Sequence, residues 1–127
     1  MKISDLLRKG SDYSEKSISD DKDSLIEIAE NDPDYRLRLE AVRAISDNDL
    51  LNEIVEKDSN RNVKIAAVEN ITSQYYLERI AKGHSNCHVR IAAVEKLEDK
   101  SVLQYIIDND SNRSVRKIAL EKMKKIM

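Results

Sequence analysis

The sequence predicts an all-α chain in which four tandem helix pairs stack as an α-α superhelix, or solenoid. The first observation is an offset of 26 residues at which similar side chains recur without an insertion. The second is an apolar spacing within each repeat that is typical of amphipathic helices. The third is composition, because 2 Gly, 1 Pro and 36% charged residues favour short, closely linked helices over strands. A length of 127 residues predicts one domain.

The offset of 26 residues defines columns of similar residues along the chain. One column consists of Leu25, Leu51, Leu77 and Leu103. A second consists of Ala41, Ala67, Ala93 and Ala119. The columns place the repeats at about 21–46, 47–72, 73–98 and 99–127. Residues 1–20 match the repeat poorly, so they are expected to form a degenerate N-terminal cap over one end of the array.

The first helix of each repeat is predicted to be amphipathic and to form the outer layer. In the second repeat Leu51, Ile54 and Val55 share one face of the segment 47–57, and the other face is polar. Asp47 stands at the N-cap position, where a carboxylate accepts hydrogen bonds from the first free backbone N–H groups. Its counterparts in the sister repeats are Asp21, Ser73 and Asp99.

The second helix of each repeat is predicted to lie inside the array. A polar turn, Asp58-Ser59-Asn60, precedes it, and Asn60 is expected to cap it. The counterparts of this cap are Asp34, Asn86 and Asn112. Apolar residues cover more than half of the helical wheel from Val63 to Ile71, so neighbours must cover the helix on several sides. Paired alanines would let adjacent helices approach closely. At the end of the chain, four lysines make the last inner helix more polar than its sisters, as expected for a capped end: Lys117, Lys122, Lys124 and Lys125.

These residues carry a resemblance to a known family. The pattern of Asp58, four residues, Val63-Lys64, two residues and Ala67 resembles the second half of a HEAT repeat, and it recurs in the other repeats. The unit is shorter than a usual HEAT repeat and is more similar to the HEAT-like repeats of phycobilisome-lyase-type proteins. The resemblance covers residues 21–127 and implies a HEAT/armadillo-like solenoid. The family includes scaffolds, adaptors and a few enzymes or lyase partners, so it indicates a fold rather than one function.

A basic residue recurs at one register position of every inner helix: Arg38, Lys64, Arg90 and Arg116. This basic row has two interpretations. A regular row of cations suits contact with the phosphates of a nucleic acid. Alternatively each cation pairs with an acid at the head of its own or a neighbouring helix, which forms an internal structural ladder. The ladder is favoured because acid and base recur together, and its members are Asp32, Arg38, Asp58, Lys64, Arg90, Asp110 and Arg116.

The segment from His84 to His88 is the only place where His and Cys residues meet. Three potential ligands, His84, Cys87 and His88, could hold part of a zinc site, but a structural site needs four ligands and no second half is evident. Sequence drift at a turn is the favoured interpretation, so no metal site is predicted. A metal that bridges two copies of the chain stays open.

No catalytic arrangement is evident in the sequence. Both histidines lie in one turn, and no serine or cysteine motif has a base at a plausible spacing. The single glycine near a turn, Gly83, does not make a phosphate-binding loop. The chain is therefore predicted not to be an enzyme, and no cofactor is predicted.

A candidate binding surface lies on the inner helices. At one register position stand Leu39, Ile65 and Ile91, which are apolar in three successive repeats where exposure to solvent would favour polar residues. On a helical wheel this side is predicted to line the concave face. Polar residues surround it: Arg36, Arg43, Asn62, Glu69, His88 and Glu95. An apolar row with a polar rim is typical of a protein-binding groove. The alternative, that the three side chains are buried between adjacent helices, stays open.

The leading prediction is a non-catalytic scaffold or adaptor that binds a protein partner on its concave face. An accessory or lyase-like subunit is the first alternative, with Cys87 as the only thiol, and nucleic-acid binding is the second. Nucleic acid is disfavoured because 24 acidic and 22 basic residues are interspersed. No apolar run predicts a membrane contact. One cysteine implies no oxidising compartment, so a cytoplasmic protein that is a monomer or a weak oligomer is expected.

Overall fold

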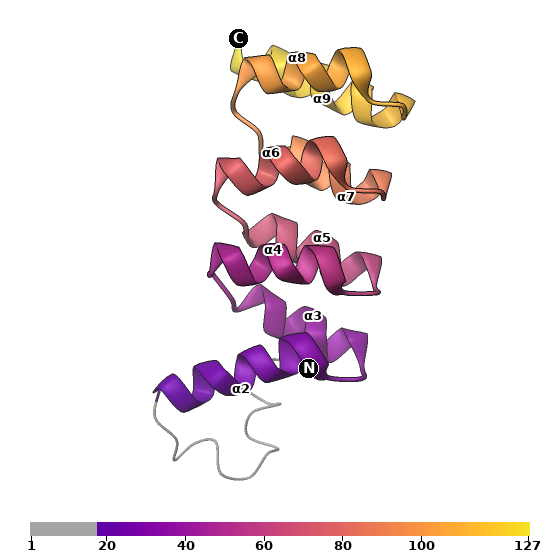
Figure 1. Cartoon of the computed structure of the whole chain (residues 1–127). Coiled ribbons are helices and arrows are strands. Elements are labelled where there is room, and N and C mark those ends of the chain that lie inside the picture. Colours follow the sequence, from indigo (N-terminus) through magenta and orange to yellow (C-terminus); the bar gives the residue numbers. More distant parts are fainter. Residues whose placement is uncertain (1–17) are drawn as a thin grey trace. The chain divides into compact units, whose positions relative to one another are not determined.

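The computed structural model describes residues 18–127, with side-chain environments from residue 22 onward, and every regular element in this range is an α-helix (Figure 1). The helices are α2 (Ile18–Asn31), α3 (Tyr35–Arg43), α4 (Asn48–Lys57), α5 (Arg61–Asn70), α6 (Gln74–Gly83), α7 (Cys87–Val94), α8 (Lys100–Asn109) and α9 (Arg113–Ile126). The predicted all-α class is confirmed for this range. Residues 1–17 of the predicted N-terminal cap lie outside the described residues.

The chain divides into two compact units, and the first is Met1–Asn70. In this unit α2 pairs with α3 and α4 pairs with α5, so that two helical hairpins form (Figure 1). The inner helices α3 and α5 pack against each other and join the two hairpins. This arrangement is the neighbour-to-neighbour contact pattern of a helical repeat.

The second unit, Ile71–Met127, repeats this arrangement. Here α6 pairs with α7 and α8 pairs with α9. The inner helices α7 and α9 pack against each other more extensively than the outer helices α6 and α8 do. Within each unit the inner helices therefore form the layer that holds successive hairpins together.

The alanine column explains how the inner helices approach each other. Ala41 and Ala67 in the first unit, and Ala93 and Ala119 in the second, are each 0% exposed. Small side chains at these positions let the backbones of adjacent helices come close. The larger core residues, such as Leu51 and Leu77, come from the single apolar stripe of the outer helices, which are buried on one face only.

Side-chain caps set the starts of the helices, as the sequence predicts. Asp47 accepts a hydrogen bond from the N–H of Leu50, and Ser73 and Asp99 cap α6 and α8 in the same way. The inner helices α3, α7 and α9 begin after Asp34, Asn86 and Asn112, whose side chains accept from the first backbone N–H groups. Each cap satisfies a donor that would otherwise lack a partner at the helix end.

The start of α2 corrects one prediction. Asp21 was expected to cap the first outer helix, but α2 begins at Ile18, so Asp21 lies inside the helix. No glycine or proline stands between Ile18 and Asp21 to stop the helix. The helix therefore continues one turn further toward the N-terminus than the helices of the sister repeats.

Candidate functional site

The turn between an outer and an inner helix is held by two acceptor side chains in succession. Asp58 Oδ1 accepts a hydrogen bond from the N–H of Asn60 at 2.8 Å. Asn60 Oδ1 in turn accepts from the N–H groups of Asn62, at 2.8 Å, and Val63, at 3.3 Å. The backbone N–H of Asp58 donates to the carbonyl oxygen of Ile54, so Asp58 is the C-cap of the outer helix α4. Asp58 therefore closes one helix and fixes the chain for the start of the next.

Asp58 also forms an ion pair with an arginine of the preceding repeat. Arg38 Nε donates to Asp58 Oδ2 at 2.9 Å, and Arg38 Nη2 donates to Asp58 Oδ1 at 3.2 Å. Arg38 Nη1 donates to the carbonyl oxygen of Asp32 at 2.8 Å, in the turn of its own repeat. One guanidinium thus joins two successive turns, and we call this arrangement an arginine clamp. Its two-pronged geometry is one that arginine, but not lysine, can adopt with a carboxylate.

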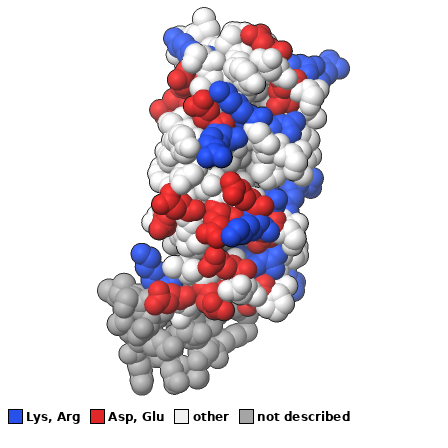
Figure 2. Space-filling view, viewed as in Figure 1, with Lys and Arg blue, Asp and Glu red and all other residues white. Residues whose placement is uncertain are grey.

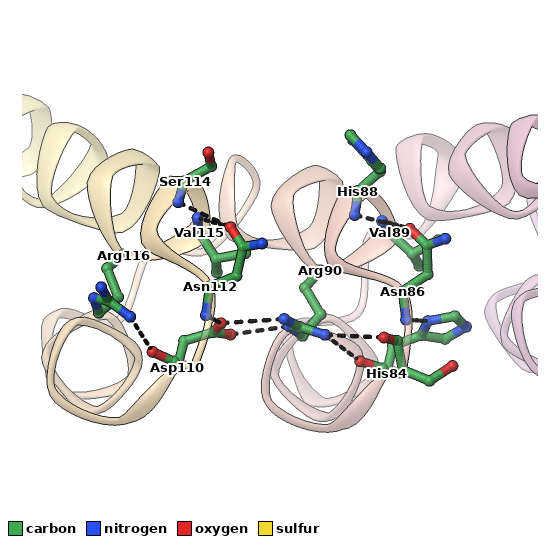
Figure 3. A network of polar contacts seen from close by, with 11 residues as sticks. His84, Asn86, His88, Val89, Arg90, Asp110, Asn112, Ser114, Val115 and Arg116 are labelled. Atoms are coloured by element: carbon green, nitrogen blue, oxygen red, sulfur yellow. Dashed lines mark hydrogen bonds and ion pairs between the residues drawn. The ribbon is translucent and has the colours of Figure 1, made fainter.

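The second unit contains an equivalent clamp (Figure 3). Arg90 Nε donates to Asp110 Oδ2 at 2.9 Å, and Arg90 Nη2 donates to Asp110 Oδ1 at 3.1 Å. Arg90 Nη1 donates to the carbonyl oxygen of His84 at 2.8 Å. Arg116 stands at the next position of the column, and its Nη1 donates to the carbonyl oxygen of Asp110 at 2.7 Å.

The clamps are largely shielded from solvent. The side chains of Arg38 and Asp58 are 12% and 6% exposed, and those of Arg90 and Asp110 are 11% and 7% exposed. The hydrogen bonds to Asp58 raise the pKa of Arg38 above its ordinary value, because they favour the charged guanidinium. Two of the predicted phosphate-contacting cations are therefore engaged inside the protein. Lys64, the remaining member of the predicted ladder in the first unit, is half-buried on α5.

His84 takes the place of the turn aspartate in the third repeat. Its Nδ1 accepts the hydrogen bond from the N–H of Asn86 at 3.0 Å, as the carboxylates of Asp58 and Asp110 do for Asn60 and Asn112 (Figure 3). Cys87 is half-buried at the first residue of α7, and His88 beside it is exposed. Among the described residues, no group of three or more His, Cys, Asp or Glu side chains is arranged to hold a metal ion.

The predicted apolar row on the inner helices is neither fully buried nor fully exposed in the first unit. Leu39 on α3 and Ile65 on α5 are half-buried, and these two helices pack against each other. The flanking polar residues that the sequence singled out are exposed on the same helices: Arg36, Arg43, Asn62 and Glu69. A depression of ≈ 420 Å³ opens beside Leu39 and Arg36. Leu39 and Ile65 are therefore partly accessible to solvent, which is between the two alternatives of full exposure and full burial.

The inner helix α7 of the second unit shows the same pattern. Ile91 is half-buried, while His88 and Glu95 are exposed. In contrast, Val89 and Ala93 on the opposite side of the helix are each 0% exposed. In each unit, therefore, the inner helices direct one side toward the core and leave partly accessible apolar carbon on the other.

Two polar residues bind the ends of inner helices or the segments that follow them, and their role was not foreseen from the sequence. Asn70 Nδ2 donates to the carbonyl oxygens of Val42, Arg43 and Ile45, at distances of 3.0 to 3.1 Å, and so satisfies the free end of α3. Gln74 Nε2 donates to the carbonyl oxygen of Lys96 at 3.1 Å, and its Oε1 accepts from the N–H of Glu98. Neither residue type recurs in its column, so the repeat pattern holds no signal for these contacts.

The outer helices of the second unit carry exposed aromatic side chains. Tyr75 on α6 is 63% exposed and Tyr105 on α8 is 50% exposed. Arg79 lies over the ring of Tyr75 and donates to its hydroxyl group at 3.1 Å, and Lys82 lies over the ring of Tyr105. Each ring therefore already has a cation as a partner within the chain.

Comparisons with known proteins identify no relative of this chain. No family model, no curated protein and no solved structure matches it. Within the described residues, no helix is both long and apolar enough to cross a bilayer.

Proposed function

We propose that this protein is a non-catalytic, cytoplasmic scaffold that binds a protein partner along its inner helices. The observation that carries the proposal is the half-burial of apolar side chains with exposed polar neighbours, seen at Leu39 and Ile65 in one unit and at Ile91 in the other. A partly accessible apolar centre with a polar rim is the arrangement in which protein interfaces concentrate their binding energy.

The architecture behind this proposal is a HEAT-like superhelix in which the four hairpins continue as one array. Hairpin-to-hairpin packing through the inner helices within each unit supports it. The two arginine clamps also support it, because they recur at the same offset, from Arg38 to Asp58 and from Arg90 to Asp110. In such an array the inner helices line a concave face, which would align Leu39, Ile65 and Ile91 as one row.

The two alternative functions receive less support from the site. A nucleic-acid role loses two of its candidate phosphate contacts, because Arg38 and Arg90 are shielded and paired with aspartates. An accessory or lyase-like role depends on Cys87, the only cysteine of the chain. Full partner capture by protein whose Cys87 has been labelled with iodoacetamide would exclude that role.

The test of the scaffold proposal is partner capture from native cell extract, with mass spectrometry, by variants of the polar rim. The double variant Arg43→Glu, Glu95→Lys reverses two exposed charges, at the last residue of α3 and at the C-cap of α7, and keeps the net charge. The control Glu56→Lys, Lys100→Glu makes the same change at exposed positions of the outer helices. Exposed substitutions of this kind change stability by only about 0.5 kcal/mol, so both variants should fold.

We expect the inner-helix variant to lose the specifically captured protein and the outer-helix control to retain it. The inner-helix variant should weaken binding of the partner, because charge reversal places like charges opposite each other at the edge of an interface. If the inner-helix variant captures the same protein as the wild type, the proposed face is not the binding face.

A further inference from the structure

Helix α9 carries an exposed basic stripe. The helix contains six of the eleven basic residues of the second unit and one of its seven acidic residues. Three of these cations and one leucine are exposed at steps of four, three and four residues: Arg113, Lys117, Leu120 and Lys124. With about 3.6 residues per turn, they fall within an arc of about 60° and extend over about 16 Å of the helix. We call these four residues the α9 stripe.

The cations of the α9 stripe have no acidic partner within the described residues, unlike two lysines of the outer helices. Lys57 Nζ lies 2.7 Å from Glu53 Oε1 on α4, one helical turn away. Lys82 Nζ lies 2.9 Å from Glu78 Oε1 on α6. Figure 2 shows basic and acidic side chains lying together over α4. In contrast, no carboxylate of the described range forms an ion pair with a cation of the stripe. A row of uncompensated cations favours an anionic partner.

The apolar side of α9 is already buried in the protein. Val115, Ala119 and Met123 are buried where α9 packs on α7 and α8. Leu120 is the single apolar member of the stripe, and it is 43% exposed. The stripe therefore offers three charges and one apolar contact to a partner, but no wide apolar face.

These properties favour an acidic protein helix over other anionic partners. Steps of four and three residues are the spacing at which one helix packs along another. A helix with carboxylates at three such positions and an apolar side chain at the fourth would match the cations and cover Leu120. The phosphates of a nucleic acid would match the cations but leave Leu120 without an apolar contact. A membrane surface requires a helix that inserts its apolar face, and that face of α9 is buried.

We propose that the α9 stripe is a docking site for an acidic amphipathic helix of a protein partner. Carboxylates of this helix pair with the three cations of the stripe, and one of its apolar side chains packs on Leu120. Exposed ion pairs contribute little each and are screened by salt, so the association is weak and salt-dependent. The stripe shares no residue with the polar rim of the proposed inner-helix surface, so this docking site is independent of the proposed function.

The test is a fluorescence anisotropy titration of labelled synthetic peptides with the full chain. Each peptide is a helix of about four turns with Glu at three positions and Leu at one, at steps of four, three and four residues, and with alanine and glutamine elsewhere. Two such peptides present the pattern in opposite chain directions. A scrambled peptide has the same composition without the spacing. We expect one patterned peptide to bind about tenfold more tightly than the scrambled peptide, with an affinity that falls at high salt.

Two neighbouring lysines of α9 supply the matched control. Lys124 belongs to the stripe, whereas Lys125 is exposed about 100° away on the helix. The stripe variant Lys117→Glu, Lys124→Glu should weaken binding of the patterned peptide by about tenfold or more. The control Lys100→Glu, Lys125→Glu changes the net charge equally at exposed positions and should weaken binding by about twofold or less.

A charge swap separates lost contacts from a lost fold. A patterned peptide with Lys in place of the two glutamates that face Lys117 and Lys124 should bind the stripe variant more tightly than it binds the wild type. Such a reversal requires a folded α9 and direct pairing across the interface, because a misfolded variant would bind neither peptide.

Three results would overturn the proposal. The first is a failure of both patterned peptides to bind more tightly than the scrambled peptide. The second is an equal loss of affinity in the stripe variant and in the control. The third is tighter binding of a single-stranded oligonucleotide, or of phosphatidylserine vesicles, that the stripe variant alone abolishes, which would assign the stripe to another class of partner.

Discussion

Asp58 has two roles. Its carboxylate accepts the backbone N–H of Asn60 within the turn and both Nε and Nη2 of Arg38 from the preceding repeat. The ion pair is largely shielded from water, so removal of one partner leaves a poorly solvated group without its counter-charge. Asp110 and Arg90 repeat this chemistry in the second unit.

Substitution of the clamp aspartate should therefore cost much more than substitution of an exposed acid. We expect Asp58→Ala to lower the free energy of unfolding by about 2–3 kcal/mol, because a largely shielded arginine loses its counter-charge and the turn loses an acceptor. Glu53 pairs with Lys57 on the surface of α4, where its side chain is 45% exposed. Glu53→Ala should cost about 0.5 kcal/mol. Urea denaturation of both variants measures the difference, and equal, small effects would show that the clamp does not hold the repeats together.

The N-cap of α8 gives a prediction about pH. Hydrogen bonds from the Ser101 hydroxyl and from the N–H groups of Ser101 and Val102 lower the pKa of Asp99 below its ordinary value of 3.8. The unfolded chain therefore binds a proton at a higher pH than the folded protein does. The stabilisation by this carboxylate is fully present above the unfolded pKa, and it is lost as the pH falls through the lower pKa of the folded state.

Asp99→Asn keeps a side-chain acceptor at the cap but removes the titration. We expect the urea midpoint of the wild type to fall further between about pH 6 and about pH 2.5 than that of Asp99→Asn. An identical fall in both proteins would show that the cap carboxylate does not contribute to the acid sensitivity.

At the scale of the helix, local signals in the sequence sufficed to place most elements. Caps and apolar spacing are properties of neighbouring residues, so α4 and α6 begin directly after Asp47 and Ser73, as predicted. The early start of α2 was not predicted, because a cap residue fixes a helix start only where the preceding residues disfavour helix. The role of Asn70 was not predicted either, since it depends on the end of α3 lying next to α5.

The candidate site was predictable in position but not in degree of burial. A helical wheel shows that Leu39 and Ile65 point away from the core side of their helices. It does not show how closely α3 and α5 pack, and that distance decides how much of each side chain stays accessible. The clamp partners had a similar limit, because the recurrence of acid and base does not reveal that Arg38 reaches the aspartate of the next repeat.

Close packing of the inner helices can be tested at the alanine column. Ala67 is 0% exposed in the middle of α5. We expect Ala67→Leu to destabilise the protein by about 1–3 kcal/mol, because added methylene groups overpack a well-filled core. Ala44→Leu is the control, since Ala44 is exposed at the end of α3, and it should change stability by about 0.5 kcal/mol or less. An unchanged melting temperature for Ala67→Leu would mean that the alanine column is not a close helix contact.

At the scale of the molecule, the buried contacts and the proposed binding surface lie on different sides of the same helices. The largely shielded clamps and the buried alanine column hold the hairpins together in each unit. The half-buried apolar residues and their exposed neighbours lie on the other side of the inner helices. A helical repeat distributes its stability over contacts between neighbouring hairpins, so the proposed binding surface is not needed to hold the hairpins together.

Site-specific photo-crosslinking in native cell extract tests the proposed binding face most directly. A photoreactive residue is placed at Arg43 or Glu95, at the C-terminal ends of the inner helices α3 and α7, or at Tyr75 or Tyr105 on the outer helices, and all four positions are exposed. We predict that the same partner protein is crosslinked from both inner positions, with a yield at least about tenfold above that of the outer positions, as a localised interface requires. Equal yields from all four positions, or a specific crosslink from the outer positions alone, would contradict a partner-binding role for the inner helices.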